Sequence, residues 1–321
     1  MMRRDFIKGS AILGMTWAGQ SLVCNSGMYH EATQRKVLRI LDAHRVNVGT
    51  LPVMRAFAGD QNDYVSPFVL FDEFGPIEVN PGADPYKVDA HPHAGVTPTT
   101  YFVSGTGHHK DSLDYDFQIG KGDFMMFSSG RGAIHMEESG KKMIEEGGIV
   151  HGFQIWLNTP SAYKWDDPTT VVHRTTNMDK IEGKGYTIQV ILGHFGKAKS
   201  NIELLSPAFY YHVKMDADTR LDIPTNANHN AFIYMVDGSL ELHEGHRLKT
   251  HQVVLYQREA ELIRLYAEKP SEFLVLGGQP LNERVYSYGP FVMNTEEEIR
   301  RCIKNYNAGL MGDPNKVNAS F

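Results

Sequence analysis

The sequence contains very little cysteine. Only two cysteines, Cys24 and Cys302, occur in 321 residues. One pair cannot form a framework of several disulfides, and it cannot form a zinc cluster held by thiolates alone. A metal site in this chain must therefore use the nitrogen and oxygen atoms of histidine, aspartate and glutamate as ligands.

An excess of positive charge is also absent. The 32 lysines and arginines are outnumbered by 38 aspartates and glutamates, which gives a formal net charge of −6. The basic residues form no stripe of the kind that marks a face for binding nucleic acid. We therefore expect small-molecule or protein partners and no nucleic acid.

Long apolar runs are the third thing that is missing. No run approaches the roughly 20 residues that a membrane-spanning helix needs, so no stable membrane span is expected. The apolar residues instead form many short runs, which are separated by turn formers that include 30 glycines and 15 prolines. This pattern is typical of an all-β protein.

The first residues resemble a bacterial twin-arginine export signal. Arg3 and Arg4 precede a short, mildly apolar stretch of Gly, Ala, Ile, Leu and Met. We interpret residues 1–36 as an export signal followed by a polar tether, which predicts a periplasmic or exported protein. An ordinary N-terminus on a cytoplasmic protein is the alternative.

Two β-rich blocks follow this segment. The runs "YFVSG" and "YMVDG" each end an apolar strand at a glycine and lead into a polar hairpin. Such a repeat fits a duplicated β-barrel. We assign residues 37–165 to an N-terminal barrel, 166–185 to a linker, 186–290 to a C-terminal barrel and 291–321 to a C-terminal helix and tail. Thr295 and Glu298 form a capping box at the start of that helix.

Two pairs of polar residues in the first block have the spacing of a metal site. His91 and His93 are two residues apart, and so are His135 and Glu137. Residues two apart on a strand point to the same face. If the two strands face one interior, three imidazoles and one carboxylate meet there, which suits one divalent first-row metal. Fe(II) is the expected ion, with Ni, Cu, Mn, Co or Zn as the other choices.

Several longer motifs resemble one protein family. These are "SPFVLFDEF", "HPHAGVTPTTYFVSG", "DSLDYDFQIGKGDFMMFSSGRGAIHMEE", "GFQIWLN", "FLVLGGQPLNE" and "YGPFVMNTEEEI". Together they are similar to the pirins, a bicupin family, over roughly residues 37–312. The resemblance implies two jelly-roll β-barrels packed face to face, with metal only in the N-terminal barrel. The metal ligands of pirins fall on His91, His93, His135 and Glu137.

The resemblance also implies an activity. Pirins include proteins with quercetin 2,3-dioxygenase activity, so this chain is expected to open flavonol-like aromatic substrates with O₂. Glu137 is then the expected general base, which takes a proton from a substrate hydroxyl. The alternatives are a non-catalytic metal-binding pirin that acts as a binding or regulatory module, and a bicupin that keeps its metal for stability alone.

The chain departs from the usual pirin pattern beside its histidine pair. Ala94, Val96 and Thr97 stand where pirins usually have arginine, phenylalanine and glutamate. These changes predict an altered pocket wall, so the motif does not identify the substrate. Gln154 and Trp156 share one strand face and are candidate pocket residues together with Thr97, although a core position for the first two is the alternative.

Overall fold

The computed structural model describes residues 33–58 and 64–318. The predicted export signal lies outside these residues.

The first barrel consists of two antiparallel sheets, one of seven strands and one of four. In sheet order, the larger sheet contains β12 (Thr169–His173), β9 (Phe124–Ser128), β6 (Val96–Ser104), β11 (Gly148–Asn158), β4 (Phe68–Val79), β3 (Leu51–Ala58) and β2 (His44–Val48). The smaller sheet contains β5 (Val88–His93), β10 (Ala133–Ser139), β7 (Thr106–Asp111) and β8 (Asp116–Gly120).

The second barrel repeats this arrangement of seven and four strands. Its larger sheet contains β1 (Val37–Asp42), β22 (Gln252–Tyr256), β19 (Asn230–Asp237), β24 (Ser271–Gly278), β17 (Ala208–Met215), β14 (Tyr186–Leu192) and β13 (Lys180–Gly183). Its smaller sheet contains β18 (Thr219–Pro224), β23 (Leu262–Ala267), β20 (Ser239–Glu241) and β21 (Arg247–Lys249). The predicted all-β fold with two barrels is confirmed.

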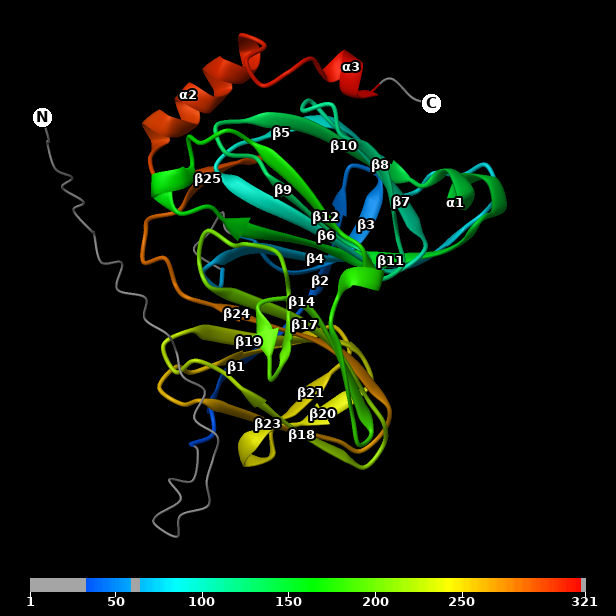
Figure 1. Ribbon diagram of the computed structural model, residues 1–321, viewed down its shortest axis with the longest axis vertical. Helices are drawn as coiled ribbons and strands as arrows, with labels where there is room; N and C mark the ends of the chain where they lie inside the picture. The colour runs from blue at the N-terminus through cyan, green and yellow to red at the C-terminus, as the bar shows by residue number, and fades with distance from the viewer. Residues whose placement is uncertain (1–32, 59–63, 319–321) are drawn as a thin grey trace, which may run out of the picture. The chain divides into compact units, whose positions relative to one another are not determined.

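The remaining elements are two short hairpins and a few helices. The hairpins pair β15 (His194–Phe195) with β16 (Ala198–Lys199) and β25 (Tyr286–Tyr288) with β26 (Phe291–Met293). The α-helices are α1 (Lys141–Glu146), α2 (Glu296–Asn307) and α3 (Pro314–Asn318). Helices α2 and α3 lie beside the small sheet of the first barrel, next to β5 and β10 (Figure 1).

Helix α2 begins as the sequence predicts. The hydroxyl of Thr295 accepts a hydrogen bond from the backbone N–H of Glu298, and the Glu298 carboxylate accepts one from the backbone N–H of Asn294. Ile299 and Cys302 point from this helix into a core that also contains Ile134 of β10. The helix therefore covers the outer side of the strand that carries His135. Within the described residues, no helix is long and apolar enough to cross a membrane.

The two large sheets face each other across the core that joins the barrels (Figure 1). Phe71 of β4 lies 4.7 Å from Tyr234 of β19, measured between ring centroids, and 6.0 Å from Phe232 on the same strand. Phe153, Ile155 and Leu157 of β11 are buried in the same core. Strand alternation therefore turns Gln154 and Trp156 away from this interface and into the first barrel.

The predicted barrel boundaries differ from the observed sheets at three strands. One is β13, which falls in the predicted linker but pairs with β14 in the second barrel. Residues 37–42 were expected in the first barrel, but β1 pairs with β22 in the second. Residues 169–173 were expected in the linker, but β12 pairs with β9 in the first barrel. In each case a strand joins the sheet whose edge it reaches, because an edge offers unpaired backbone groups regardless of the order of the chain.

One buried carboxylate joins the two barrels. The Glu73 side chain on β4 is fully buried and accepts hydrogen bonds from His151 Nε2 at 2.8 Å, His251 Nδ1 at 2.9 Å and the Tyr234 hydroxyl at 2.5 Å. His151 belongs to the first barrel, whereas Tyr234 and His251 belong to the second. Replacing Glu73 would leave several buried donors without an acceptor.

We therefore expect Glu73→Ala to lower the free energy of unfolding by about 3 kcal/mol. The measurement is denaturant unfolding at pH 7. The matched control is Glu78→Ala, an exposed position on the same strand, for which little change is expected. Equal stability of the two variants would contradict a joining role for Glu73.

The same cluster gives a pH dependence with a definite sign. The hydrogen bond to Glu73 raises the pKa of His251 above its ordinary value of 6.5, against the opposing effect of burial. Because the pKa of His251 is raised in the folded state, its hydrogen bond to Glu73 stabilises the folded state fully below pH 6.5. This stabilisation is lost as the pH rises through the raised pKa. The difference in Tm between the wild type and His251→Asn should therefore shrink from about pH 6 to about pH 9. A difference that grows with pH would contradict this.

Candidate metal centre

Three histidines of the first barrel meet inside its small sheet. His91 and His93 lie on β5, and His135 lies directly opposite His91 on the antiparallel strand β10. The ring centroids are 4.5 Å apart for His91 and His135, 4.9 Å for His91 and His93, and 5.0 Å for His93 and His135. One ring nitrogen from each lies within 4.8 Å of the others. Strand alternation and register together bring these three predicted residues to one point.

Backbone carbonyls fix the orientation of two of these rings. His91 Nδ1 lies 2.8 Å from the carbonyl oxygen of Asp89, and His93 Nδ1 lies 3.2 Å from that of Pro290. A carbonyl oxygen can only accept, so each Nδ1 is the donor and each Nε2 keeps a lone pair for the cluster. Metal-binding histidines typically have this second contact.

Burial keeps the three imidazoles neutral at pH 7. It lowers the pKa of His91, and it lowers the pKa values of His93 and His135 well below the ordinary 6.5. The neighbouring imidazoles lower the values of His93 and His135 further, because like charges would repel. Neutral imidazole is the form that binds metal. The donor set therefore fits a divalent first-row metal.

The carboxylate of Glu137 lies next to this cluster but is oriented by other residues. Its Oε1 accepts a hydrogen bond from the Thr100 hydroxyl at 2.6 Å, and its Oε2 accepts one from Gln154 Nε2 at 2.8 Å. The pairing of β5 with β10 shifts register between His135 and Glu137. The position of the Glu137 carboxylate therefore does not follow from the simple strand alternation that the sequence predicts. The ligand group to which Glu137 belongs contains His135 and a further residue, His109.

His109 is the residue that the sequence analysis missed. It lies on β7 directly opposite Glu137 and is fully buried. Its Nδ1 and the Nδ1 of His135 are buried atoms without a hydrogen-bond partner among the described residues. His109 and Asp111 are two residues apart in a strand, which is the same spacing that identifies the pair His91 and His93 and the pair His135 and Glu137 in the sequence.

A cavity of about 320 Å³ opens onto the cluster. His91, His93, Glu137, Gln154 and Trp156 line it, so both candidate residues of β11 face the site. Thr97, the third candidate, lines a different cavity. The rest of the wall is mainly apolar, with one ion pair: Val48, Leu51, Val53, Arg55, Ala58, Val69, Leu70, Asp72, Phe74, Tyr86, Val88, Val285, Ser287, Gly289 and Val292. The cavity therefore suits a largely apolar small molecule.

The chain returns from the second barrel to complete this cavity. The backbone N–H of Val292 donates to the carbonyl oxygen of Ala94 at 3.0 Å, one residue after His93. The buried Lys164 Nζ donates to the carbonyl oxygens of Gly95 and Val292 at 2.5 and 2.8 Å. A Cβ on Gly95 would lie 2.2 Å from the Val292 oxygen, so only glycine permits this approach. The wall beside the histidines thus depends on residues 285–292.

The second barrel has apolar residues in the corresponding places. Its strands β18 and β23 pair as β5 and β10 do, and their facing residues are Leu221 with Leu265 and Ile223 with Ile263. All four belong to one buried apolar core. Within the described residues, the ligand groups found all lie in the first barrel.

Comparisons with known proteins match the two barrels to two family models. The family model described as "Pirin" matches residues 50–157, and "Pirin C-terminal cupin domain" matches residues 210–312. A Pseudomonas aeruginosa protein named "Putative quercetin 2,3-dioxygenase" is 29% identical over 280 residues, which cover 86% of this chain and 98% of that protein.

Solved structures are similar as well. A quercetin 2,3-dioxygenase from Acinetobacter baumannii superposes with a TM-score of 0.84 at 30% identity, over 88% of this chain and 100% of that one. The bacterial pirin YhhW from Escherichia coli in complex with nickel(II) shares the fold, with a TM-score of 0.58 at 20% identity over 75% of this chain and 99% of that one.

Proposed function

The chain belongs to the pirin family, and from this we propose that it is a metal-dependent dioxygenase that opens flavonol-like aromatic compounds with O₂. The observation that carries the proposal is the cluster of three imidazoles, two of them buried and one half-buried, at a mainly apolar cavity. The relatives named as quercetin 2,3-dioxygenases support the reaction class.

We propose that His91, His93 and His135, with Glu137 as the oxygen ligand, hold one divalent metal. Iron(II) is the ion we expect, and nickel, copper, manganese, cobalt and zinc suit the same ligand types. When bound, any of these ions would supply a Lewis acid beside the cavity, and iron(II) would also supply a centre that can exchange electrons with O₂.

The residues around the cavity then have separate tasks. The Glu137 carboxylate accepts the proton of a substrate hydroxyl at one of its oxygens, and Thr100 and Gln154 orient it for this. Trp156 lies 4.8 Å from His93, nearly perpendicular to it, and offers a flat apolar wall for an aromatic ring. The surrounding valines and leucines exclude water from the site.

The test is anaerobic loading with iron(II), followed by O₂ addition with a panel of flavonols and other enediols. We expect O₂ uptake with release of CO from the flavonols. Metal binding without O₂ uptake for any compound would contradict the dioxygenase and favour the non-catalytic binding module. The panel also identifies the substrate, which the changes at Ala94, Val96 and Thr97 leave open.

We also propose that the protein is exported, because Arg3 and Arg4 precede an apolar stretch of the twin-arginine type. N-terminal sequencing of the protein from a bacterial cell envelope tests this. A shortened N-terminus is the expected result, and an uncut chain found only in the cytoplasm would contradict it.

A further inference from the structure

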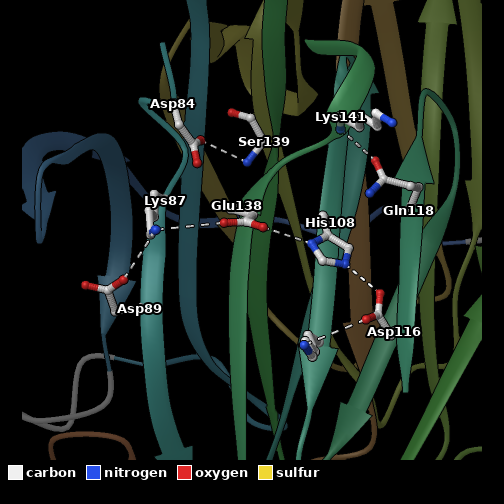
Figure 2. Close-up of polar contacts among 10 residues, drawn as sticks. Asp84, Lys87, Asp89, His108, Asp116, Gln118, Glu138, Ser139 and Lys141 are labelled. Carbon is white, nitrogen blue, oxygen red and sulfur yellow. Dashed lines mark hydrogen bonds and ion pairs between the residues drawn. The ribbon is translucent and has the colours of Figure 1, made fainter. Parts of the chain in front are cut away.

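Two adjacent histidines on β7 have different surroundings. Successive residues of a strand point to opposite faces, so His108 and His109 lie on opposite sides of the small sheet. Figure 2 shows His108 between two carboxylates, with Nδ1 3.0 Å from Glu138 Oε1 and Nε2 2.7 Å from Asp116 Oδ1. Both nitrogens of His108 are therefore accounted for by polar contacts outside the metal cluster.

His109 has only one of its nitrogens accounted for in this way. Its Nε2 lies 3.0 Å from Asp111 Oδ2, and its ring stacks on Phe117 with centroids 5.1 Å apart. Its Nδ1 is a buried atom without a hydrogen-bond partner among the described residues. Buried polar atoms without a partner are uncommon in folded proteins, so this atom requires an explanation.

Asp111 holds the His109 ring in one orientation. Its Oδ2 also accepts from the Thr170 hydroxyl at 2.6 Å, and its Oδ1 accepts from the backbone N–H groups of Leu113 and Tyr115 at 2.9 and 3.2 Å. Because a carboxylate accepts, the Nε2 of His109 donates, which leaves Nδ1 as the ring nitrogen that could bind a metal ion. A histidine held by a carboxylate, with its other nitrogen open, is the usual arrangement of a metal ligand.

His109 also belongs to a second group of possible metal ligands. His109, His135 and Glu137 each offer one atom, and these atoms lie within 4.8 Å of one another. All three residues are buried, and His109 and His135 are completely so. We propose that this group is a second, inner metal position, which shares His135 and Glu137 with the position proposed above. The inference rests on the proposed metal function and extends it.

Sharing His135 has a consequence for the number of ions. An imidazole that keeps a proton on one ring nitrogen has a single lone pair for a metal ion, so His135 binds one ion at a time. The two positions are therefore alternatives, and the chain holds one divalent ion. His91 and His93 line the cavity, so an ion held by them can meet a substrate. An ion in the inner position would have one carboxylate and two imidazoles as ligands, all from buried residues. Loss of a cavity ligand should therefore move the ion inward rather than release it.

Cobalt(II) binding to the folded full-length chain tests this inference, with the optical spectrum, stoichiometry and competition against a chelator as readouts. We expect His93→Ala to keep one cobalt per chain with an altered spectrum, and His109→Asn also to keep one. The double variant should bind at least about 100-fold more weakly than either single variant. His108→Asn, the matched control on the same strand, should bind cobalt as the wild type does.

A second test keeps the His109 side chain and changes only the carboxylate that contacts it. The variant combines Asp111→Asn with His93→Ala. It should weaken cobalt binding about 10-fold relative to His93→Ala alone, because the amide keeps one accepting oxygen in place of two, and its NH2 group cannot accept from His109 Nε2. Loss of all cobalt in His93→Ala, or equal affinity of that variant and the double variant, would overturn the inner position. Cobalt binding as expected without O₂ uptake would instead contradict the dioxygenase and leave the inner position intact.

Discussion

Replacing His93 by alanine is expected to lower kcat/KM for a flavonol substrate by about 10³-fold. A metal ion in such a site supplies several kcal/mol of transition-state stabilisation, and each 1.36 kcal/mol corresponds to a factor of ten. His93 lines the cavity, its Nδ1 is fixed by the Pro290 carbonyl oxygen, and its ring faces Trp156. Without it, the metal lacks the ligand that holds it at the substrate.

The control for this prediction is His194→Ala, an exposed histidine of the second barrel. Initial rates of O₂ uptake should be measured for both variants after the same metal loading. We expect His194→Ala to match the wild type. Wild-type turnover in His93→Ala would contradict the assignment of His93 to the metal centre.

Glu137→Gln is expected to lower kcat by about 10²- to 10⁴-fold, which is the usual contribution of a general base. The substitution keeps the size of the side chain and a hydrogen-bonding oxygen for Thr100. It removes the carboxylate that accepts the substrate proton. The three imidazoles remain, so the variant should still bind a metal ion, with lower affinity.

Rates should therefore be compared at full metal occupancy, with metal content measured in the same samples. Glu145→Gln, at an exposed position of α1, is the matched control and should not change kcat. A fully loaded Glu137→Gln variant with wild-type kcat would contradict the role of Glu137 as base. Unchanged metal affinity would contradict its role as the oxygen ligand.

The sequence predicts those residues of the site whose direction is determined by strand alternation alone. His91 and His93 share a face because they are two residues apart, and a second pair with the same spacing follows on β10. The family motifs then indicate which strands face each other. For the same reason Gln154 and Trp156 reach the cavity, since the intervening residues of β11 are buried between the barrels.

The part that the sequence does not predict depends on register and on distant chain segments. His109 joins the cluster because β7 pairs with β10 in one particular register, which places it opposite Glu137. The acceptor for His93 comes from Pro290, 197 residues later in the chain. Thr97 is adjacent to the histidine pair in sequence but lines another cavity.

The structure shows where two of the residues that depart from the pirin motif are packed. Ala94 is completely buried and packs in the core that includes Ile299 and Cys302 of α2. Val96 is completely buried beside Val69 and Val292. Both small residues therefore pack against parts of the chain that are remote in sequence, which a local motif cannot show.

Incorporation of ¹⁸O₂ is the most direct test of the proposed dioxygenase activity. The iron-loaded protein should be supplied with ¹⁸O₂ and the best flavonol of the panel, and the ring-opened product analysed by mass spectrometry. We expect both atoms of one O₂ molecule to enter the product, and His93→Ala to form almost none of it. A product without ¹⁸O, or O₂ consumption that yields only hydrogen peroxide and a dehydrogenated substrate, would contradict it.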